Sequence, residues 1–185
     1  MLRDRLKNLT KPFHDELETK SIPQKIISKT ITKDEYIHLL SVFYSILQPF
    51  EIELSNQSAK FASFGISINQ RAKAHLLEND LTNLGVALPK TIKYSEQDFE
   101  HLVGAMYVFE GSTMGGIHLS RELALVDFAK DAHSYFTPYK QDTMQRWQEF
   151  CLFLDQIDKQ SNFDGDTTIL SACKTFLSLK KLVNI

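Results

Sequence analysis

A cluster of glycines in the second half of the chain is the first feature that could form part of a functional site. Four of the seven glycines fall within thirteen residues of a helical pattern, namely Gly104, Gly111, Gly115 and Gly116. Each glycine inside a helix costs roughly 0.5–1 kcal/mol relative to alanine. At about 100° per residue, Gly104, Gly111 and Gly115 lie within about 40° of one another, and Ser112 and Gly116 lie beside them. One face of this helix therefore lacks large side chains for about three turns.

A bare helix face has two physical explanations. Another helix can pack closely against it, or a flat ligand can lie against the backbone. The adjacent pair Gly115-Gly116 favours a ligand, because two neighbouring glycines loosen the helix axis and let it bend. The residues alone leave both explanations open.

His14 is the histidine best placed to bind a metal. Glu18 follows it by four residues on the same helix, so its carboxylate can accept a hydrogen bond from one ring nitrogen. The other ring nitrogen would then be a metal ligand in the arrangement usual for histidine. The same predicted helix carries the basic residues Lys7, Arg3 and Lys11, which could bind anionic groups or simply face solvent. His118 could face a pocket or the opposite side of its helix.

A second arrangement of metal-ligand type is the pair Glu35 and His38. The spacing Glu-x-x-His occurs in di-iron helix bundles. Such sites need a second pair of this kind with further glutamates, and the chain contains no second Glu-x-x-His. A di-iron site is therefore the weaker hypothesis.

Helical periodicity extends through nearly the whole chain and predicts the elements that position these residues. Pro12 is expected to bend the first helix or to restart it with Thr10 as the cap, and Pro49 is expected to kink the second. Ser95 is expected to cap the fourth helix. The predicted helices span residues 2–18, 32–54 (beginning with a capping box of Thr32 and Glu35), 69–84, 96–127, 142–159 and 167–183. No segment predicts a strand, so we expect one all-α, multi-helix domain over residues 1–185.

Composition narrows the function classes. Of the 185 residues, 43% are hydrophobic, which is enough to form a sizeable core. The formal net charge of −2 gives no indication of a nucleic-acid or membrane-surface partner. No apolar run approaches the roughly 18 residues that span a bilayer, and the N-terminal stretch does not resemble a signal peptide. Cys151 and Cys173 have no CxxC spacing and indicate reduced thiols, so we expect a cytoplasmic protein.

The sequence resembles the bacterial haem oxygenase family over nearly its whole length. Residues Leu6 to Glu18 resemble the proximal helix of that family, and Tyr107 to Gly116, followed by Ser120-Arg121-Glu122-Leu123, resemble the distal helix. Further matches lie in the other predicted helices and loops: Glu35-Tyr36, Pro49-Phe50-Glu51, Leu77, Asp80-Leu81, Leu84-Gly85, Tyr135-Phe136, Tyr139, Trp147, Phe150, Ala172 and Phe176.

This resemblance implies that His14 ligates the iron of haem, which would be both substrate and cofactor. It also implies cleavage of haem to biliverdin, carbon monoxide and Fe²⁺, with O₂ and an external donor of the ferredoxin or flavodoxin type. Ser112 stands where mammalian members have an aspartate that anchors water. The implied catalytic residues are His14, Gly111, Ser112 and Gly115, and the implied haem-binding residues are these four with Lys7, Glu18, Tyr107, Gly116, Arg121 and Phe176. A haem carrier without turnover and a di-iron relative of the fold are the alternatives.

Overall fold

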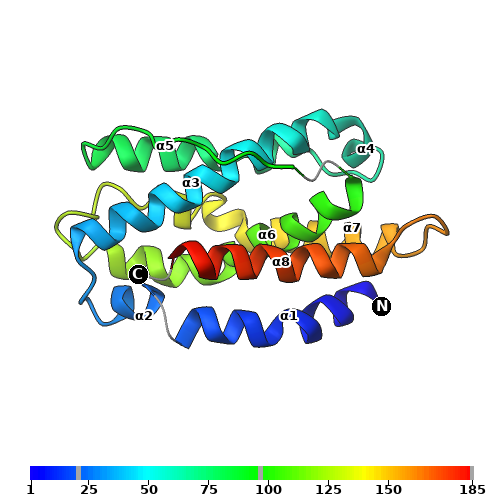
Figure 1. Cartoon of the computed structure of the whole chain (residues 1–185), viewed down its shortest axis with the longest axis horizontal. Coiled ribbons are helices and arrows are strands. Elements are labelled where there is room, and N and C mark those ends of the chain that lie inside the picture. The colour runs from blue at the N-terminus through cyan, green and yellow to red at the C-terminus, as the bar shows by residue number, and fades with distance from the viewer. Residues whose placement is uncertain (20–21, 96–97, 184–185) are drawn as a thin grey trace.

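The computed structural model describes residues 1–19, 22–95 and 98–183 (Figure 1). This part of the chain contains helices and no β-strand, so the predicted all-α class is confirmed. The α-helices are α1 (Leu2–Thr19), α2 (Ile22–Ile27), α3 (Lys33–Asn56), α4 (Ser58–Ala62), α5 (Ala74–Asn83), α6 (Phe99–Leu123), α7 (Thr143–Ile157) and α8 (Gly165–Val183). Three short 3-10 helices connect them: η1 (Ile68–Arg71), η2 (Ser134–Phe136) and η3 (Lys140–Asp142). Among the described helices, none combines the length and hydropathy needed to cross a membrane.

The helices form layers around α6 and α8. Figure 1 shows α3 and α5 on one side of this pair and α1 and α2 on the other. Helix α8 packs against both α6 and α1, and α3 packs against α5. Helices α1, α6 and α8 run in the same direction along the molecule (Figure 1). This parallel course decides which residues of α1 and α6 lie at the same level.

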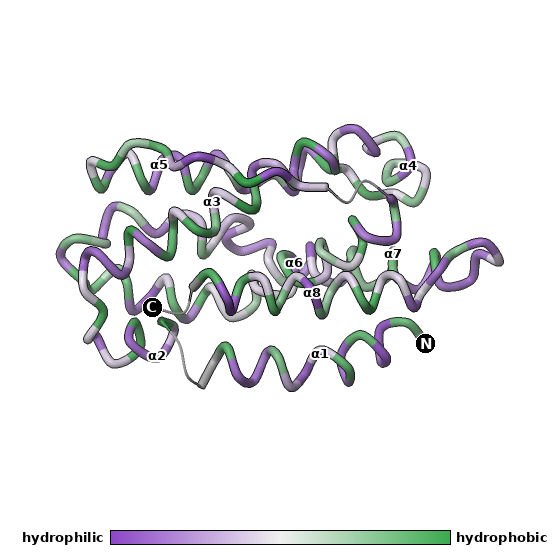
Figure 2. Tube along the Cα trace, viewed as in Figure 1, coloured by the Kyte–Doolittle hydropathy of each residue, from purple (hydrophilic) through white to green (hydrophobic). Residues whose placement is uncertain are grey.

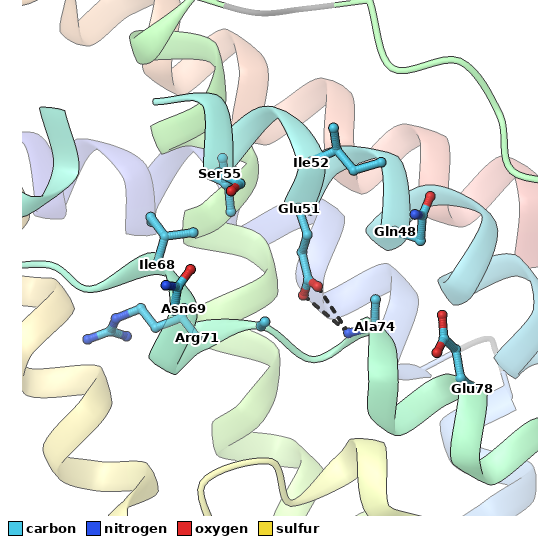
Figure 3. A pocket seen from close by; sticks show the side chains of 11 residues that line it. Gln48, Glu51, Ile52, Ser55, Ile68, Asn69, Arg71, Ala74 and Glu78 are labelled. Atoms are coloured by element: carbon cyan, nitrogen blue, oxygen red, sulfur yellow. Dashed lines mark hydrogen bonds between the residues drawn. The ribbon is translucent and has the colours of Figure 1, made fainter. Parts of the chain in front are cut away.

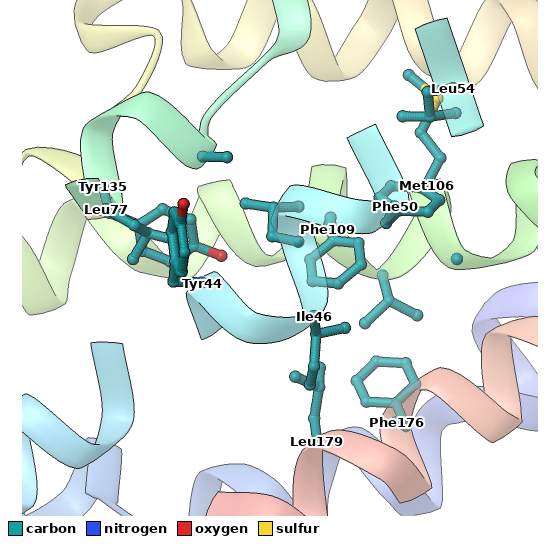
Figure 4. Packing of buried hydrophobic residues seen from close by; sticks show 14 of the residues in the cluster. Tyr44, Ile46, Phe50, Leu54, Leu77, Met106, Phe109, Tyr135, Phe176 and Leu179 are labelled. Atoms are coloured by element: carbon teal, nitrogen blue, oxygen red, sulfur yellow. The ribbon is translucent and has the colours of Figure 1, made fainter. Parts of the chain in front are cut away.

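Large aromatic and aliphatic side chains fill the space between the layers. Figure 4 shows Phe50 of α3, Phe109 of α6 and Phe176 of α8 among the buried residues. The ring centroids of Phe50 and Phe109 lie 5.2 Å apart. Hydrophobic and hydrophilic residues alternate along the helices (Figure 2), as expected where one face is buried and the other is solvated. The core therefore holds α6 firmly on the side that faces α3 and α8.

Pro12 and Pro49 both lie inside continuous helices. At Pro49 the missing N–H would have bonded the Ser45 carbonyl, and the N–H of Ile92 donates to that carbonyl instead, at 3.0 Å. The expected restart of the first helix at Thr10 is wrong, because α1 continues through Pro12. Thr10 is buried within α1, and its hydroxyl donates to the Leu6 carbonyl at 2.7 Å.

The predicted helix ends are partly confirmed. Thr32 and Glu35 form the expected capping box, with both hydrogen bonds present. The expected cap at Ser95 is wrong, because α6 begins at Phe99 after Asp98, and the predicted start at residue 96 lies outside the described residues. The predicted helix 69–84 divides into η1 and α5, and α2 was not predicted.

Candidate active site

The four glycines of α6 have two different surroundings. A Cβ at Gly104 would overlap the Thr168 carbonyl oxygen of α8, and one at Gly116 would overlap the Phe136 carbonyl oxygen of η2. These two glycines are needed for close packing. Of the two explanations for the bare helix face, close helix packing therefore holds at Gly104. Gly116 faces η2, so we leave it out of the site proposed below.

Gly111 and Gly115, the other two glycines of α6, are not packed against a neighbouring backbone. A Cβ at Gly115 would meet nothing within 4 Å, and one at Gly111 would meet only the Trp147 ring, at 3.7 Å. Ser112, Gly115 and His118 are exposed although α6 is the central helix of the fold. We call Gly111, Ser112, Gly115 and His118 the open face of α6. A flat ligand could approach the helix backbone on this face.

His14 lies on α1 with an accessible imidazole. Its side chain is 53% exposed, and one ring nitrogen lies 3.9 Å from a carboxylate oxygen of Asp15. The ring meets Phe176 of α8 edge to face, with centroids 6.2 Å apart and planes at 76°. Phe176 thus limits the rotation of the imidazole. The predicted partner Glu18 belongs to α1, but its side chain lies outside the described residues.

The level of α1 relative to α6 follows from the packing of both helices on α8. The Cys173 thiol of α8 lies 4.0 Å from the Leu9 carbonyl oxygen of α1, and a Cβ at Gly104 of α6 would come within 3.0 Å of the neighbouring Ala172 nitrogen. The three helices run in the same direction, and His14 and Gly111 follow these contacts by five and seven residues, or about one and a half to two turns (Figure 1). His14 and the open face of α6 therefore lie at nearly the same level of the fold, with Phe176 of α8 beside His14.

Tyr107 borders this level on the N-terminal side of Gly111. It is half-buried, its ring centroid lies 5.9 Å from that of Trp147, and burial raises the pKa of its phenol. Lys7 is exposed on α1, about two turns before His14 and on nearly the same side of the helix. Arg121 is exposed but lies about 120° around α6 from Gly115, outside the open face. Tyr107 and Lys7 thus remain candidates for polar contacts with a ligand, and Arg121 is less well placed.

A buried ionic cluster behind Gly111 was not predicted. Glu110 is only 1% exposed, and it accepts hydrogen bonds from Lys73 Nζ at 2.5 Å and from the Tyr139 hydroxyl at 2.7 Å. Arg71 forms an ion pair with the other carboxylate oxygen of Glu110 and also contacts Glu149, at 3.2 Å. The charges of Lys73 and Arg71 hold the pKa of Glu110 below its ordinary value despite its burial. Glu110 lies about 140° around α6 from Gly115, so the cluster anchors α6 from a side that faces away from Gly115.

The sequence held one clue to this cluster. Glu110 follows the apolar run Met106 to Phe109 in the middle of a helix, where a carboxylate is buried only if it is paired. Its partners are Arg71, Lys73 and Tyr139, which lie 29 to 39 residues away in the sequence. No local pattern could have named them.

A pocket of about 300 Å³ lies between α3 and the segment of η1 and α5 (Figure 3). It is lined by residues such as Gln48, Ser55 and Glu78, and by none of the predicted site residues. Glu51 points across it and accepts hydrogen bonds from the N–H groups of Lys73 and Ala74 (Figure 3). This carboxylate therefore caps the start of α5, which explains its position without a ligand.

The Glu35 and His38 pair has structural partners. Glu35 belongs to the capping box and pairs with Lys25, and these bonds lower the pKa of Glu35 to about 2. His38 Nε2 lies 3.0 Å from the Leu182 carbonyl oxygen. No group of three or more potential metal ligands occurs among the residues that the structure describes. Nothing in this part of the chain supports a di-iron site.

The fold and the site define an all-helical protein that presents an accessible histidine at the level of a bare stretch of its central helix. The family model described as Heme oxygenase matches residues 1–184, and the chain belongs to this family. Membership of the family associates the chain with haem degradation in general.

The fold also matches a solved structure, described as the NO- and CO-bound heme oxygenase from Neisseria meningitidis. The TM-score is 0.78 and the sequence identity is 19%, over 99% of this chain and 90% of that chain. At this identity the match supports the fold alone. No curated protein matches the sequence significantly.

Proposed function

We propose that this chain is a haem oxygenase that binds haem between His14 and the open face of α6 and cleaves it to biliverdin, carbon monoxide and Fe²⁺. The observation that carries the proposal is the placement of His14 at nearly the level of Gly111, which follows from the packing of α1 and α6 on α8. In this position His14 and the glycines of the open face could lie on opposite sides of a flat ring. Free thiols at Cys151 and Cys173 suit the reducing cytoplasm that we propose as its compartment.

The bound haem would supply the iron at which O₂ is reduced, while its porphyrin ring would be the substrate. The part of His14 is to offer a ring nitrogen to the iron, with Phe176 restricting the imidazole. Gly111 and Gly115 leave room above the ring and allow water to reach the α6 backbone. Ser112 adds one hydroxyl at the same face. Lys7 and Tyr107 are the proposed partners of the haem propionates.

Hemin titration of the purified protein tests binding first. We expect a shifted Soret band with one equivalent, and His14→Ala should lose the imidazole-ligated spectrum. His75→Ala is the matched control, because His75 is exposed on α5 and lies outside the proposed site. A His14→Ala spectrum identical to that of the wild-type complex would refute the assignment of the ligand.

Reduction of the complex in air tests turnover. With a ferredoxin- or flavodoxin-type donor system, we expect the Soret band to decay while the absorption of biliverdin rises and carbon monoxide is released. A haem complex that stays unchanged under reductant and O₂ would indicate a haem carrier instead. No Soret shift in the wild-type protein would exclude both functions.

A further inference from the structure

Trp147 of α7 lies against the open face of α6 at one position. A Cβ at Gly111 would lie 3.7 Å and 3.8 Å from two carbons of the six-membered ring of Trp147. A Cβ at Gly115, about one turn later, would meet nothing within 4 Å. The Trp147 side chain is half-buried, so part of it remains accessible. The indole therefore marks the place along α6 at which the open face begins.

Aromatic rings from two helices hold the indole in place. Its ring centroid lies 5.9 Å from that of Tyr107 of α6, with the planes at 50°. It also lies 5.9 Å from that of Phe150 of α7, a fully buried residue, with the planes at 37°. These contacts restrict the rotation of the side chain, because a large ring cannot turn freely between packed neighbours. Trp147 is therefore a fixed border of the open face.

One buried guanidinium holds the backbone of both helices at this contact. Arg71 forms an ion pair with Glu110, which directly precedes Gly111. It also donates to the backbone carbonyl of Arg146, which directly precedes Trp147, at 3.1 Å. The Arg71 side chain is 3% exposed, so water competes little for these bonds. The ionic cluster thus also fixes Trp147 relative to Gly111.

We propose that Trp147 limits how far a flat ring can move along α6, and thereby determines the orientation of the haem ring in its own plane. This inference rests on the proposed haem site. The substituents of haem are not arranged symmetrically, so the edges of the ring differ in shape. A fixed border favours the orientation whose edge fits against the indole. Because each edge carries one meso carbon, one orientation predicts one predominant isomer of biliverdin.

The isomer composition of the biliverdin formed, separated by chromatography, tests this role. We expect one predominant isomer from the wild-type protein. Trp147→Ala removes the border, and we expect the ratio of the major isomer to the others to fall at least about fivefold, which corresponds to about 1 kcal/mol between orientations. Trp147→Phe keeps a smaller ring at this position and should give a ratio between those of the wild-type protein and Trp147→Ala.

Phe64→Ala is the matched control, because Phe64 is also a half-buried aromatic residue that packs against α7. Its ring centroid lies 6.0 Å from that of Phe153 and 6.3 Å from that of Phe99. Phe99 is the first residue of α6, twelve residues before Gly111. We expect Phe64→Ala to keep the wild-type isomer ratio. Urea unfolding of the haem-free variants measures the loss of packing in each.

Proton NMR of the ferric cyanide complex measures the orientation of the ring without turnover. Each orientation gives its own set of signals from the haem methyl groups. We expect one predominant set in the wild-type protein and in Phe64→Ala, and at least one further set in Trp147→Ala.

The outcomes separate this inference from the proposed function. A wild-type protein that shows no Soret shift would refute haem binding and this inference with it. Haem binding without turnover would refute the proposed cleavage, and the methyl signals would still decide the role of Trp147. The inference alone would be refuted if the wild-type protein bound haem in a mixture of orientations, if Trp147→Ala kept the wild-type distribution, or if Phe64→Ala changed it as strongly.

Discussion

We expect alanine substitutions at the neighbouring residues Gly115 and Gly116 to change the stability of the protein in opposite directions. Each is replaced by alanine, which adds one methyl group to the middle of α6. At Gly115 the new Cβ would meet nothing within 4 Å, whereas at Gly116 it would overlap the backbone oxygen of Phe136. Two residues adjacent in the sequence therefore provide controls for each other.

The size of each effect follows from these surroundings. Gly115→Ala gains helix propensity without a steric cost, so we expect the free energy of unfolding of the haem-free protein to rise by about 0.5–1 kcal/mol. For a chain of this length that gain raises Tm by about 1–4 °C. Gly116→Ala has the same gain, but a backbone oxygen cannot rotate away from the methyl group. Overpacking of this kind costs about 1–3 kcal/mol, so we expect a net loss of stability.

Urea unfolding of the two haem-free variants measures both changes, and hemin titration tests the ligand site. A side chain larger than alanine on the open face would occupy the space proposed for the ring. We therefore expect Gly115→Leu to weaken hemin binding at least tenfold, which is about 1.4 kcal/mol, while its haem-free form stays folded.

Two results would refute this reasoning. If Gly115→Ala destabilised the haem-free protein as much as Gly116→Ala does, the open face would be a packed surface. If Gly115→Leu bound hemin with wild-type affinity, the ring would lie elsewhere.

The remaining predictions concern stability. Glu110→Ala leaves Lys73 buried without a carboxylate and leaves Arg71 with Glu149 alone, and we expect urea unfolding to show a loss of about 3–5 kcal/mol; a loss below about 1 kcal/mol would contradict the buried cluster. Because the pKa of Glu110 is lowered from an ordinary value of 4.5, its stabilisation is present above that pH and is lost as the pH falls through the folded-state pKa. Below about pH 4.5, the free energy of unfolding should therefore fall less steeply with decreasing pH in Glu110→Ala than in the wild-type protein. Thr32→Ala should cost about 1 kcal/mol through the lost cap of α3, and an unchanged Tm would show that the cap adds nothing.

Local signals in the sequence predicted most of the helices. The capping box of Thr32 and Glu35 needs only residues within one turn, and the structure contains both of its bonds. The helical spacing of apolar residues likewise predicted α1, α3, α6, α7 and α8 to within a few residues. These features depend on the chain within one or two turns of each residue.

The features that were missed depend on residues far apart in the sequence. Helix α5 begins at Ala74, where the Glu51 carboxylate of α3 accepts hydrogen bonds at its N-terminus. The carbonyl left without a partner by Pro49 is satisfied by Ile92 in a loop. A proline therefore does not end a helix when another segment supplies the missing hydrogen bond, and only the tertiary structure shows that it does.

The glycines of α6 also show that a local sequence pattern does not reveal which residues are packed in the tertiary structure. Four glycines weaken this helix by roughly 2–4 kcal/mol relative to alanine, so α6 needs other interactions to stay straight beside a ligand. The close contacts at Gly104 and Gly116 lie on either side of Gly111, and the ion pairs of Glu110 fix the turn between them. Packing and ligand binding were competing explanations of one pattern in the sequence. In the structure Gly104 and Gly116 are the packed glycines, and together with Glu110 they fix the backbone that Gly111 and Gly115 leave open, which is where we propose that the ligand binds.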